Sequence, residues 1–413
     1  VDVARKIEAA NRAPVLDPLP GVLTALSRVP EAAQDFFAED PTLLNRLINE
    51  RRTLDDGKAL SAAILAATTV FRDHSGSPTN PSRGYLSAKL TSEVIYLEAQ
   101  RLESGKPLSL TPYTLSSIFA SYIRDVNRAA NGGRQTGQVV GEDHATIPGR
   151  EDWAASFDPY MLRGVMKEVF KQDPQSLPIV MGAQTIWANR LFDASAARMA
   201  AGEGTSYFRD AALEVGSGFG LITEAAGIAH IKKGEELDAA QERGVAIVSA
   251  LVNTGLAIPQ RWPWPIVAGA ADSWAGFISE ATKGKAAEKA VKEANSTLEE
   301  TKFLMQQLAA QAMLNHGLFG TSDPPAKTHP WATLSDLRPG DDPRKAPNNF
   351  LKNDGKTLLT RGEMFASLDA SRTSATYNAY YRWANEGLAG EIWSSLRNDL
   401  LTGYQHGFEQ FRR

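Results

Sequence analysis

The clearest helical pattern in the chain lies in residues 111–133, which read TPYTLSSIFASYIRDVNRAANGG. Thr111 and Pro112 are residue types that favour the N-cap and the first turn of a helix. Apolar residues then recur every three or four positions, as they do along one face of an α-helix; they are Leu115, Ile118, Phe119, Tyr122, Ile123 and Val126. The sequence Asn-Gly-Gly at 131–133 ends the pattern. We therefore expect one helix over 112–130.

The same spacing recurs along most of the chain, and no segment shows the sustained alternation of a β-strand. It predicts further helices over residues 27–52, 58–71, 86–103, 160–171, 176–201, 285–315, 361–368 and 371–411. The first of these is one or two helices, with a break at Asp40-Pro41 where Asp40 can cap a new helix, and Asp173-Pro174 divides 160–171 from 176–201. Polar segments rich in Gly and Pro predict loops over 74–84, 134–152 and 321–352. The fold class expected from these patterns is all-α, a multi-helix globular bundle with a central apolar helical pair and long surface loops.

The composition is that of an ordinary globular protein. The 413 residues are 43% hydrophobic and 22% charged, with a net charge of -4 and a pI near 6.0. This balance disfavours a dedicated nucleic-acid-binding protein, because it supplies no general attraction for phosphates. The chain has no cysteine, which excludes disulfides, thiolate metal sites and cysteine nucleophiles.

One segment is nearly uncharged. Between residues 244 and 279 the only charged residues are Arg261 and Asp272. A membrane-spanning helix needs about 20 consecutive apolar residues, whereas the apolar run 245–258 is shorter and ends at Pro259. Neither half of this segment is expected to span a bilayer alone.

Two interpretations of this segment remain open. Residues 244–278 either form a buried helical pair at the centre of the fold or a hairpin that inserts into a bilayer. In the second case Trp262 and Trp264 would lie at the membrane interface. Trp262, Trp264, Trp274 and Phe277 are therefore the candidate residues for contact with a membrane or a partner.

Changes in composition divide the chain into four segments. They are an N-terminal helical subdomain (1–133), a loop with a helical connection (134–209), the apolar central helices (210–284) and a C-terminal helical region (285–413) that contains the Pro-rich loop 321–352. The helix expected over 285–315 carries many charges, so we expect a surface helix with one packed side.

No motif identifies a catalytic, cofactor-binding or metal-ligating residue. The six histidines are scattered without the spacing of a His-Glu-x-x-His site. The glycines of 216–220 lack the spacing of a dinucleotide or phosphate-binding loop, and we interpret them as small residues for a close helix contact. An enzyme with a site assembled from dispersed acids and histidines remains a third possibility.

Several segments resemble an uncharacterised all-helical domain of actinobacterial proteins linked to type VII secretion and polymorphic toxins. The similar segments are Pro30–Ala38, Leu43–Arg51, Leu60–Thr68, Ile118–Val126 and Asn353–Lys356. In addition, Trp274-Ala275-Gly276 has the Trp-x-Gly form of small helical-hairpin proteins exported by type VII systems.

The resemblance implies a helical scaffold or delivery region, with any toxin activity on a separate segment and no catalytic residue carried over. We therefore expect a non-enzymatic structural, targeting or delivery module of a secreted actinobacterial, toxin-associated protein. Its expected partners are other proteins or other segments of a larger parent chain, and its expected location is the exterior or cell surface after a cytoplasmic stage. The alternative is a membrane-inserting or pore-forming module that uses residues 244–278.

Overall fold

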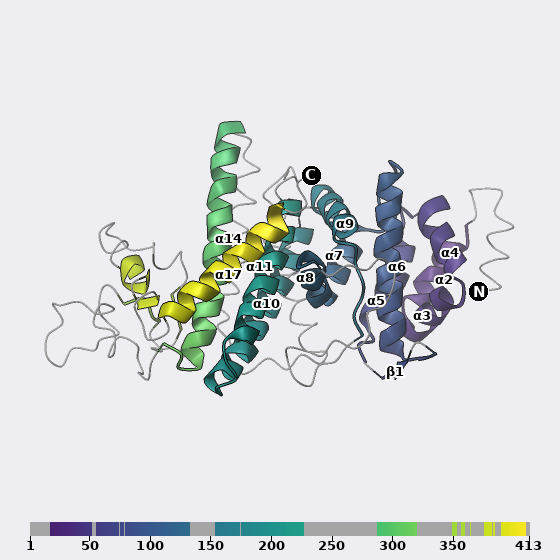
Figure 1. Cartoon of the computed structure of the whole chain (residues 1–413). Helices are drawn as coiled ribbons and strands as arrows, with labels where there is room; N and C mark the ends of the chain where they lie inside the picture. The colour runs from purple at the N-terminus through teal and green to yellow at the C-terminus, as the bar shows by residue number, and fades with distance from the viewer. Residues whose placement is uncertain are drawn as a thin grey trace, which may run out of the picture. The chain divides into compact units, whose positions relative to one another are not determined.

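Helices dominate the structure, a computed structural model shown in Figure 1. It describes residues 17–51, 55–73, 75–77, 79–132, 153–173, 175–226, 287–319, 349–352, 357–359, 364, 376–381, 383–384 and 390–409, with side chains in the helix 287–315 described from residue 301. Within these residues the only sheet is one two-stranded hairpin. The predicted all-α fold is confirmed. The apolar segment 244–278 lies outside the described residues.

The chain forms two compact units, and each is assembled from two separate stretches of sequence. Unit 1 combines Val1–Ala183 with Leu221–Leu251, and unit 2 combines Gln184–Gly220 with Val252–Arg413. Helices α10 (Ser176–Ala200) and α11 (Ser206–Ala226) contribute residues to both units. The four-segment division drawn from composition stays a prediction.

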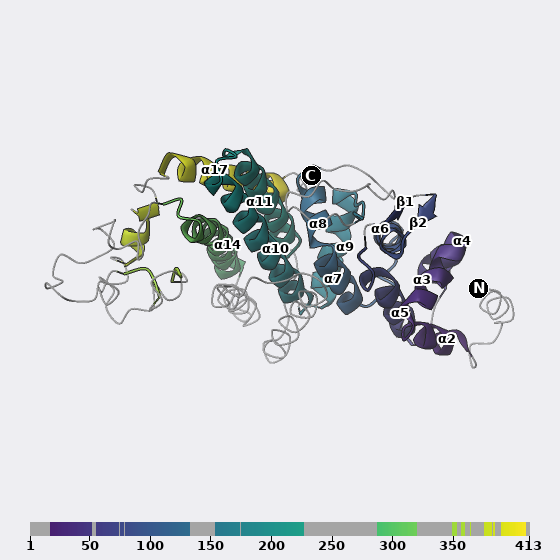
Figure 2. The ribbon, with the colours of Figure 1, turned by 90° about the horizontal axis from the view of Figure 1, so that it is seen from below.

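Unit 1 is built from short and medium helices, with α5 in contact with four of them. Helix α5 packs against α2, α3, α6 and α7, and α6 packs in addition against α9 (Figure 2). The elements are α2 (Leu19–Leu26), α3 (Pro30–Glu39), α4 (Pro41–Asn45), the π-helix η1 (Arg46–Glu50), α5 (Lys58–Thr69), β1 (Gly76–Ser77), β2 (Asn80–Pro81), α6 (Arg83–Glu103), α7 (Pro112–Ser121), α8 (Ile123–Ala130) and α9 (Pro159–Gln172).

Four helices begin at an Asp-Pro sequence. The carboxylates of Asp17, Asp40, Asp158 and Asp173 each accept a hydrogen bond of 2.9–3.1 Å from a backbone N–H at the start of α2, α4, α9 and α10. Proline suits the first turn because its fixed φ is helical and no N–H is lost there, while the carboxylate satisfies an N–H that the helix cannot. The same dipeptide therefore marks helix starts throughout the described chain.

The helix expected over 112–130 is divided in the structure. Thr111 caps it as predicted, through a 3.4 Å bond from the Thr114 N–H. Helix α7 then ends at Ser121, and Tyr122 leaves the helical conformation with φ -111° and ψ 30°. Its buried hydroxyl donates to the Thr68 carbonyl oxygen of α5, 2.8 Å away. We attribute the division to this tertiary hydrogen bond, which no local pattern reveals.

Two further elements differ from the prediction. Helix α2 was not among the predicted helices; its short sequence is LPGVLTAL, with Pro20 in the first turn. The expected loop 74–84 contains the antiparallel pair β1–β2, in which Gly76 faces Pro81 and Ser77 faces Asn80.

Unit 2 contains α14 (Ala287–Asn315), α17 (Gly390–Glu409) and the adjoining parts of α10 and α11. The prediction that α14 has one packed side is wrong for residues 301–313, which are buried nearly all round, including Thr301, Gln307 and Gln311. The reason is local composition, because no charged residue follows Lys302 within the helix. Leu351 and Leu358 form an isolated antiparallel bridge beside this helix.

Helices α11 and α17 touch through their backbones. A Cβ added to Gly216, Gly220, Gly403 or Gly407 would lie under 3.0 Å from backbone atoms of the facing helix, closer than real Cβ atoms come. Only glycine permits this approach. The interpretation of residues 216–220 as small residues for a close helix contact is therefore confirmed. We call these four residues the glycine crossing.

Candidate functional site

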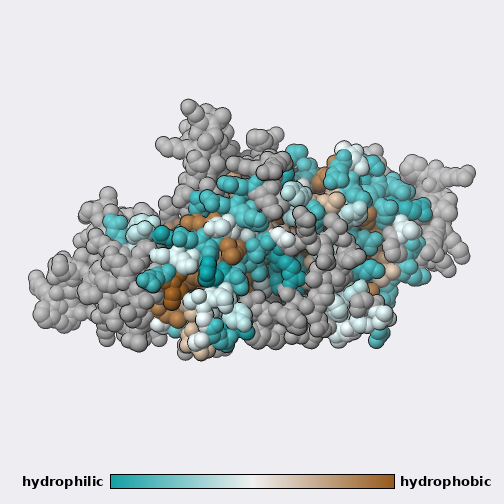
Figure 3. Space-filling model, in the orientation of Figure 1, coloured by the Kyte–Doolittle hydropathy of each residue, from teal (hydrophilic) through white to brown (hydrophobic). Residues whose placement is uncertain are grey.

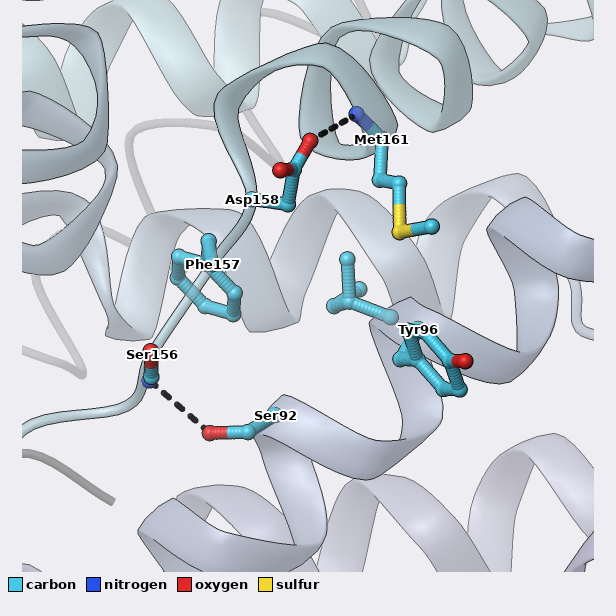
Figure 4. A pocket seen from close by; sticks show the side chains of 7 residues that line it. Ser92, Tyr96, Ser156, Phe157, Asp158 and Met161 are labelled. Carbon is cyan, nitrogen blue, oxygen red and sulfur yellow. Dashed lines mark hydrogen bonds between the residues drawn. The ribbon is translucent and has the colours of Figure 1, made fainter. Parts of the chain in front are cut away.

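A small cavity in unit 1 lies between α6 and the start of α9 (Figure 4). It is lined by Ser92, Ile95 and Tyr96 of α6, by Ser156, Phe157 and Asp158 of the segment that leads into α9, and by Met161 of α9. Its volume is about 10 Å³, which is room for one water molecule. Ligand sites for small molecules are typically at least about 300 Å³, so this cavity does not admit a substrate of ordinary size.

The polar groups around the cavity hold the segment 153–158 in place. The Ser156 N–H donates to the Ser92 hydroxyl at 2.8 Å, and that hydroxyl donates to the Ala88 carbonyl at 2.9 Å. Asp158 accepts from two N–H groups of the first turn of α9, one of which is that of Met161 at 3.0 Å (Figure 4). These serine and aspartate groups serve as structural contacts.

A second polar group lies in the interior of unit 1 at Asp125. Its side chain is fully buried, and one carboxylate oxygen accepts from the Ala155 N–H at 3.3 Å. The Arg124 guanidinium lies 3.7 Å from the other oxygen. Asp125 therefore ties α8 to the same segment that Ser92 holds from α6.

Tyr122 lies beside Asp125 in this interior. Burial raises the pKa of its hydroxyl, and the charge of Arg72 opposes that shift. The guanidinium of Arg72 lies 3.9 Å above the centre of the Tyr122 ring, a cation–π contact that is strengthened when water is excluded. The phenol stays protonated and donates to Thr68, so it acts as a structural donor.

Glu98 is a buried carboxylate that accepts several hydrogen bonds. It accepts from the Ser109 N–H at 3.1 and 3.2 Å, from the Ser109 hydroxyl at 2.5 Å and from the Leu110 N–H at 2.9 Å. Burial raises the pKa of Glu98, and these hydrogen bonds together with Arg101 lower it, with burial the larger effect. Glu98 fixes the loop between α6 and α7.

Buried glutamine side chains also form hydrogen bonds with the backbone of distant segments, and they do so in both units. In unit 1, the Gln34 amide donates to the carbonyl oxygens of Ala67 and Arg83 at 3.3 and 2.8 Å. In unit 2, Gln307 donates to the Leu359 carbonyl at 2.6 Å, and Gln311 accepts from the Leu358 N–H at 2.9 Å. One of these glutamines thus donates to the backbone of the extended segment and the other accepts from it, which is the pattern of hydrogen bonds that a neighbouring strand would make.

The sequence patterns missed these polar contacts. Gln34, Glu98, Asp125, Gln307 and Gln311 were not singled out, because a polar residue on a helix is usually solvated. One signal was present for Glu98, which follows Val94 by four positions on the buried side of its helix.

Metal ligands do not cluster in the residues that the structure describes, where no group of three or more His, Asp or Glu side chains lies within reach of one ion. Of the six histidines, His316 and His406 fall in this part of the chain. His316 Nε2 lies 2.9 Å from Asp193 Oδ1, which joins the end of α14 to α10.

The candidate contact residues Trp262, Trp264, Trp274 and Phe277 lie outside the described residues, as does the whole segment 244–278. The membrane interpretation therefore stays a prediction. Among the helices that the structure does describe, none combines the length and the apolar character needed to cross a membrane.

The visible face of the molecule carries mostly hydrophilic residues where it is described, with hydrophobic residues in a few separate patches (Figure 3). The large apolar or aromatic side chains exposed in the described residues are Val29, Val70, Tyr113, Tyr160, Tyr207 and Tyr381. Arg198 lies 3.8 Å above the Tyr207 ring, and Arg397 lies 6.0 Å from that of Tyr381.

The chain matches no protein-family model, no curated protein and no solved structure. The resemblance to actinobacterial type VII-linked domains therefore stays an expectation drawn from the sequence.

Proposed function

We propose that the chain is a non-enzymatic helical module that serves structure, targeting or delivery in a secreted actinobacterial, toxin-associated protein. The proposal that the module is non-enzymatic is supported by the role of its buried polar side chains, which bind backbone groups. Glu98, Asp125, Gln34 and Gln311 each bind the backbone of a segment 11 to 49 residues away. The two carboxylates among them, Glu98 and Asp125, would otherwise be candidates for acid–base chemistry, and they hold the scaffold together instead.

The α6–α9 cavity itself is too small to serve as an active site. General acid–base catalysis needs a side chain within hydrogen-bond reach of a bound substrate. At about 10 Å³ the cavity has room for no more than about one water molecule, and its Asp158 is engaged as a helix cap. The location and the toxin association rest on the resemblance alone.

Catalysis is tested with the full chain and two isosteric variants, Asp125→Asn and Glu98→Gln. The purified proteins are assayed against pooled ester, peptide, glycoside and phosphoester substrates. We expect no turnover above that of a boiled sample. Turnover that is lost in either variant, while its circular dichroism spectrum matches that of the wild type, overturns the non-enzymatic proposal.

Delivery is tested separately by expression in an actinobacterium with an active or an inactivated type VII system. We expect the chain in the culture filtrate only when the system is active, with a cytoplasmic enzyme as the control for lysis. Equal amounts in both filtrates would reject export by the type VII system. They would not bear on the non-enzymatic proposal, which the turnover assay tests.

A further inference from the structure

Helix α8 ends at an exposed asparagine that is followed by glycine. Asn131 is the C-cap residue, with φ -87° and ψ 15°, and Gly132 follows it in the left-handed region with φ 92°. Both residues are exposed, and a Cβ added to Gly132 would meet nothing within 4 Å. The backbone at this junction is therefore open to solvent and is not shielded by a side chain at position 132.

An asparagine in this context reacts with the backbone of the residue that follows it. The Gly132 nitrogen loses its proton and attacks the side-chain carbonyl carbon of Asn131, which closes a succinimide ring and releases ammonia. Water then opens the ring at either of its carbonyl groups, and the product is aspartate or isoaspartate. Water is the only other reactant. Glycine favours ring closure because it has no side chain and its backbone adopts conformations that other residues avoid.

Ring closure requires the last turn of α8 to open. The Asn131 N–H donates to the Asn127 carbonyl at 2.9 Å, and the Gly132 N–H donates to the Ala129 carbonyl at 3.3 Å. The second bond is longer than the usual N–H···O distance of about 2.9–3.0 Å. The attacking nitrogen is therefore the more weakly held of the two, at a helix end, where local opening costs little free energy.

We propose that Asn131 is a site of spontaneous conversion to aspartate and isoaspartate, and that this conversion weakens the end of α8. An aspartate places a negative charge beside the last carbonyl groups of the helix, where the helix dipole disfavours it. An isoaspartate adds a methylene group to the backbone and displaces the Gly132 N–H from its acceptor. Helix α8 carries Asp125, which binds the Ala155 N–H. The inference does not depend on the proposed function.

The test follows the intact wild-type chain during incubation at neutral and at mildly alkaline pH. Samples are digested, and mass spectrometry measures the conversion of amide to acid in the peptide that contains residue 131. Isoaspartate is detected with protein L-isoaspartyl methyltransferase. We expect both aspartate and isoaspartate at position 131, and faster conversion at the higher pH, because the attacking nitrogen must lose its proton.

Asn315 is the matched control within the same chain. It is exposed at the end of α14 and is followed by His316 rather than by glycine. We expect conversion at Asn131 to be several times faster than at Asn315. Conversion that is no faster at Asn131 overturns the proposal, as does aspartate without isoaspartate, which would indicate direct hydrolysis of the amide.

Two variants test the effect on α8. Asn131→Gln should not convert, because its longer side chain would have to close a larger ring, and Asn131→Asp mimics one of the two products. We expect Asn131→Asp to unfold at a lower urea concentration than Asn131→Gln. Equal midpoints for these variants would overturn the proposed weakening of α8 by the new charge, even if the conversion itself takes place.

Discussion

The Ser217 hydroxyl lies 3.2 Å from the carbonyl oxygen of Gly403, to which it donates across the contact between α11 and α17. The same hydroxyl also lies 2.9 Å from the Leu213 carbonyl of its own helix. So short a side chain bridges two helices only where their backbones touch. At the glycine crossing, α11 and α17 are therefore in contact through their main chains, and the Ser217 hydroxyl adds a hydrogen bond between them.

Gly403→Ala should destabilise the protein by about 2–3 kcal/mol, because the new methyl group forces apart two backbones that cannot relax independently. Chemical denaturation followed by circular dichroism measures the change. The matched control is Gly164→Ala in α9, where an added Cβ meets nothing within 4 Å. That variant should gain up to about 1 kcal/mol from helix propensity. Similar effects of the two substitutions would contradict the role of the crossing.

Local signals predicted much of the helix content and one feature of the crossing. Asp40-Pro41 and Asp173-Pro174 marked helix boundaries correctly, since capping is decided within one turn of chain. The glycines at 216–220 indicated a close helix contact. The helix that they contact, α17, was not predicted. Gly403 and Gly407 have no side chains, so no pattern of apolar residues at these positions links α17 to α11.

The polar contacts could not be predicted for a related reason. Gln307 and Gln311 stand in an uncharged, largely apolar stretch of helix, but nothing in that stretch identifies the extended segment at 358–359 that gives them buried partners. Tyr122 divides a helix whose local pattern is continuous, because its hydroxyl donates a hydrogen bond to a backbone carbonyl 54 residues away. Local propensity is overridden at these positions by tertiary hydrogen bonds.

Tyr380→Phe should stabilise unit 2 by about 1 kcal/mol. A buried hydroxyl without an acceptor loses its hydrogen bonds to water on folding and gains none in return, so its removal should raise the free energy of unfolding. The Tyr380 hydroxyl is buried and has no hydrogen-bond partner within the described part of the chain. Burial raises the pKa of Tyr380, so the group remains a protonated donor. Thermal and chemical denaturation both measure the gain.

The control for this prediction is Tyr122→Phe, which removes a hydroxyl that is bonded to the Thr68 carbonyl. It should lose about 1 kcal/mol, with the opposite sign. A loss of stability in Tyr380→Phe would show that its hydroxyl has an acceptor in solution.

Glu98 should make the stability depend on pH in a defined direction. Because burial raises its pKa, the folded protein binds a proton at a higher pH than the unfolded chain does. The free energy of unfolding contributed by this titration therefore rises as the pH falls from neutral through the folded-state pKa, and it becomes constant below the unfolded-state pKa.

The measurement is the difference in free energy of unfolding between the wild type and Glu98→Gln at a series of pH values. The other titrating groups are common to both proteins, so the difference isolates Glu98, and it should change in favour of the wild type as the pH falls. The reverse slope would mean that the bonds from Ser109 and Leu110 outweigh burial and lower the pKa.

Gln311→Ala should destabilise the contact between α14 and the extended segment at 357–359. The substitution leaves the buried Leu358 N–H without its acceptor, at a cost of about 1–3 kcal/mol. Gln306→Ala is the matched control, since Gln306 lies on the same helix and is partly exposed. It should change the stability by no more than about 0.5 kcal/mol. Amide hydrogen exchange gives the local readout, because Leu358 should lose protection in Gln311→Ala and keep it in Gln306→Ala; equal exchange in the two variants would show that Gln311 does not hold this segment.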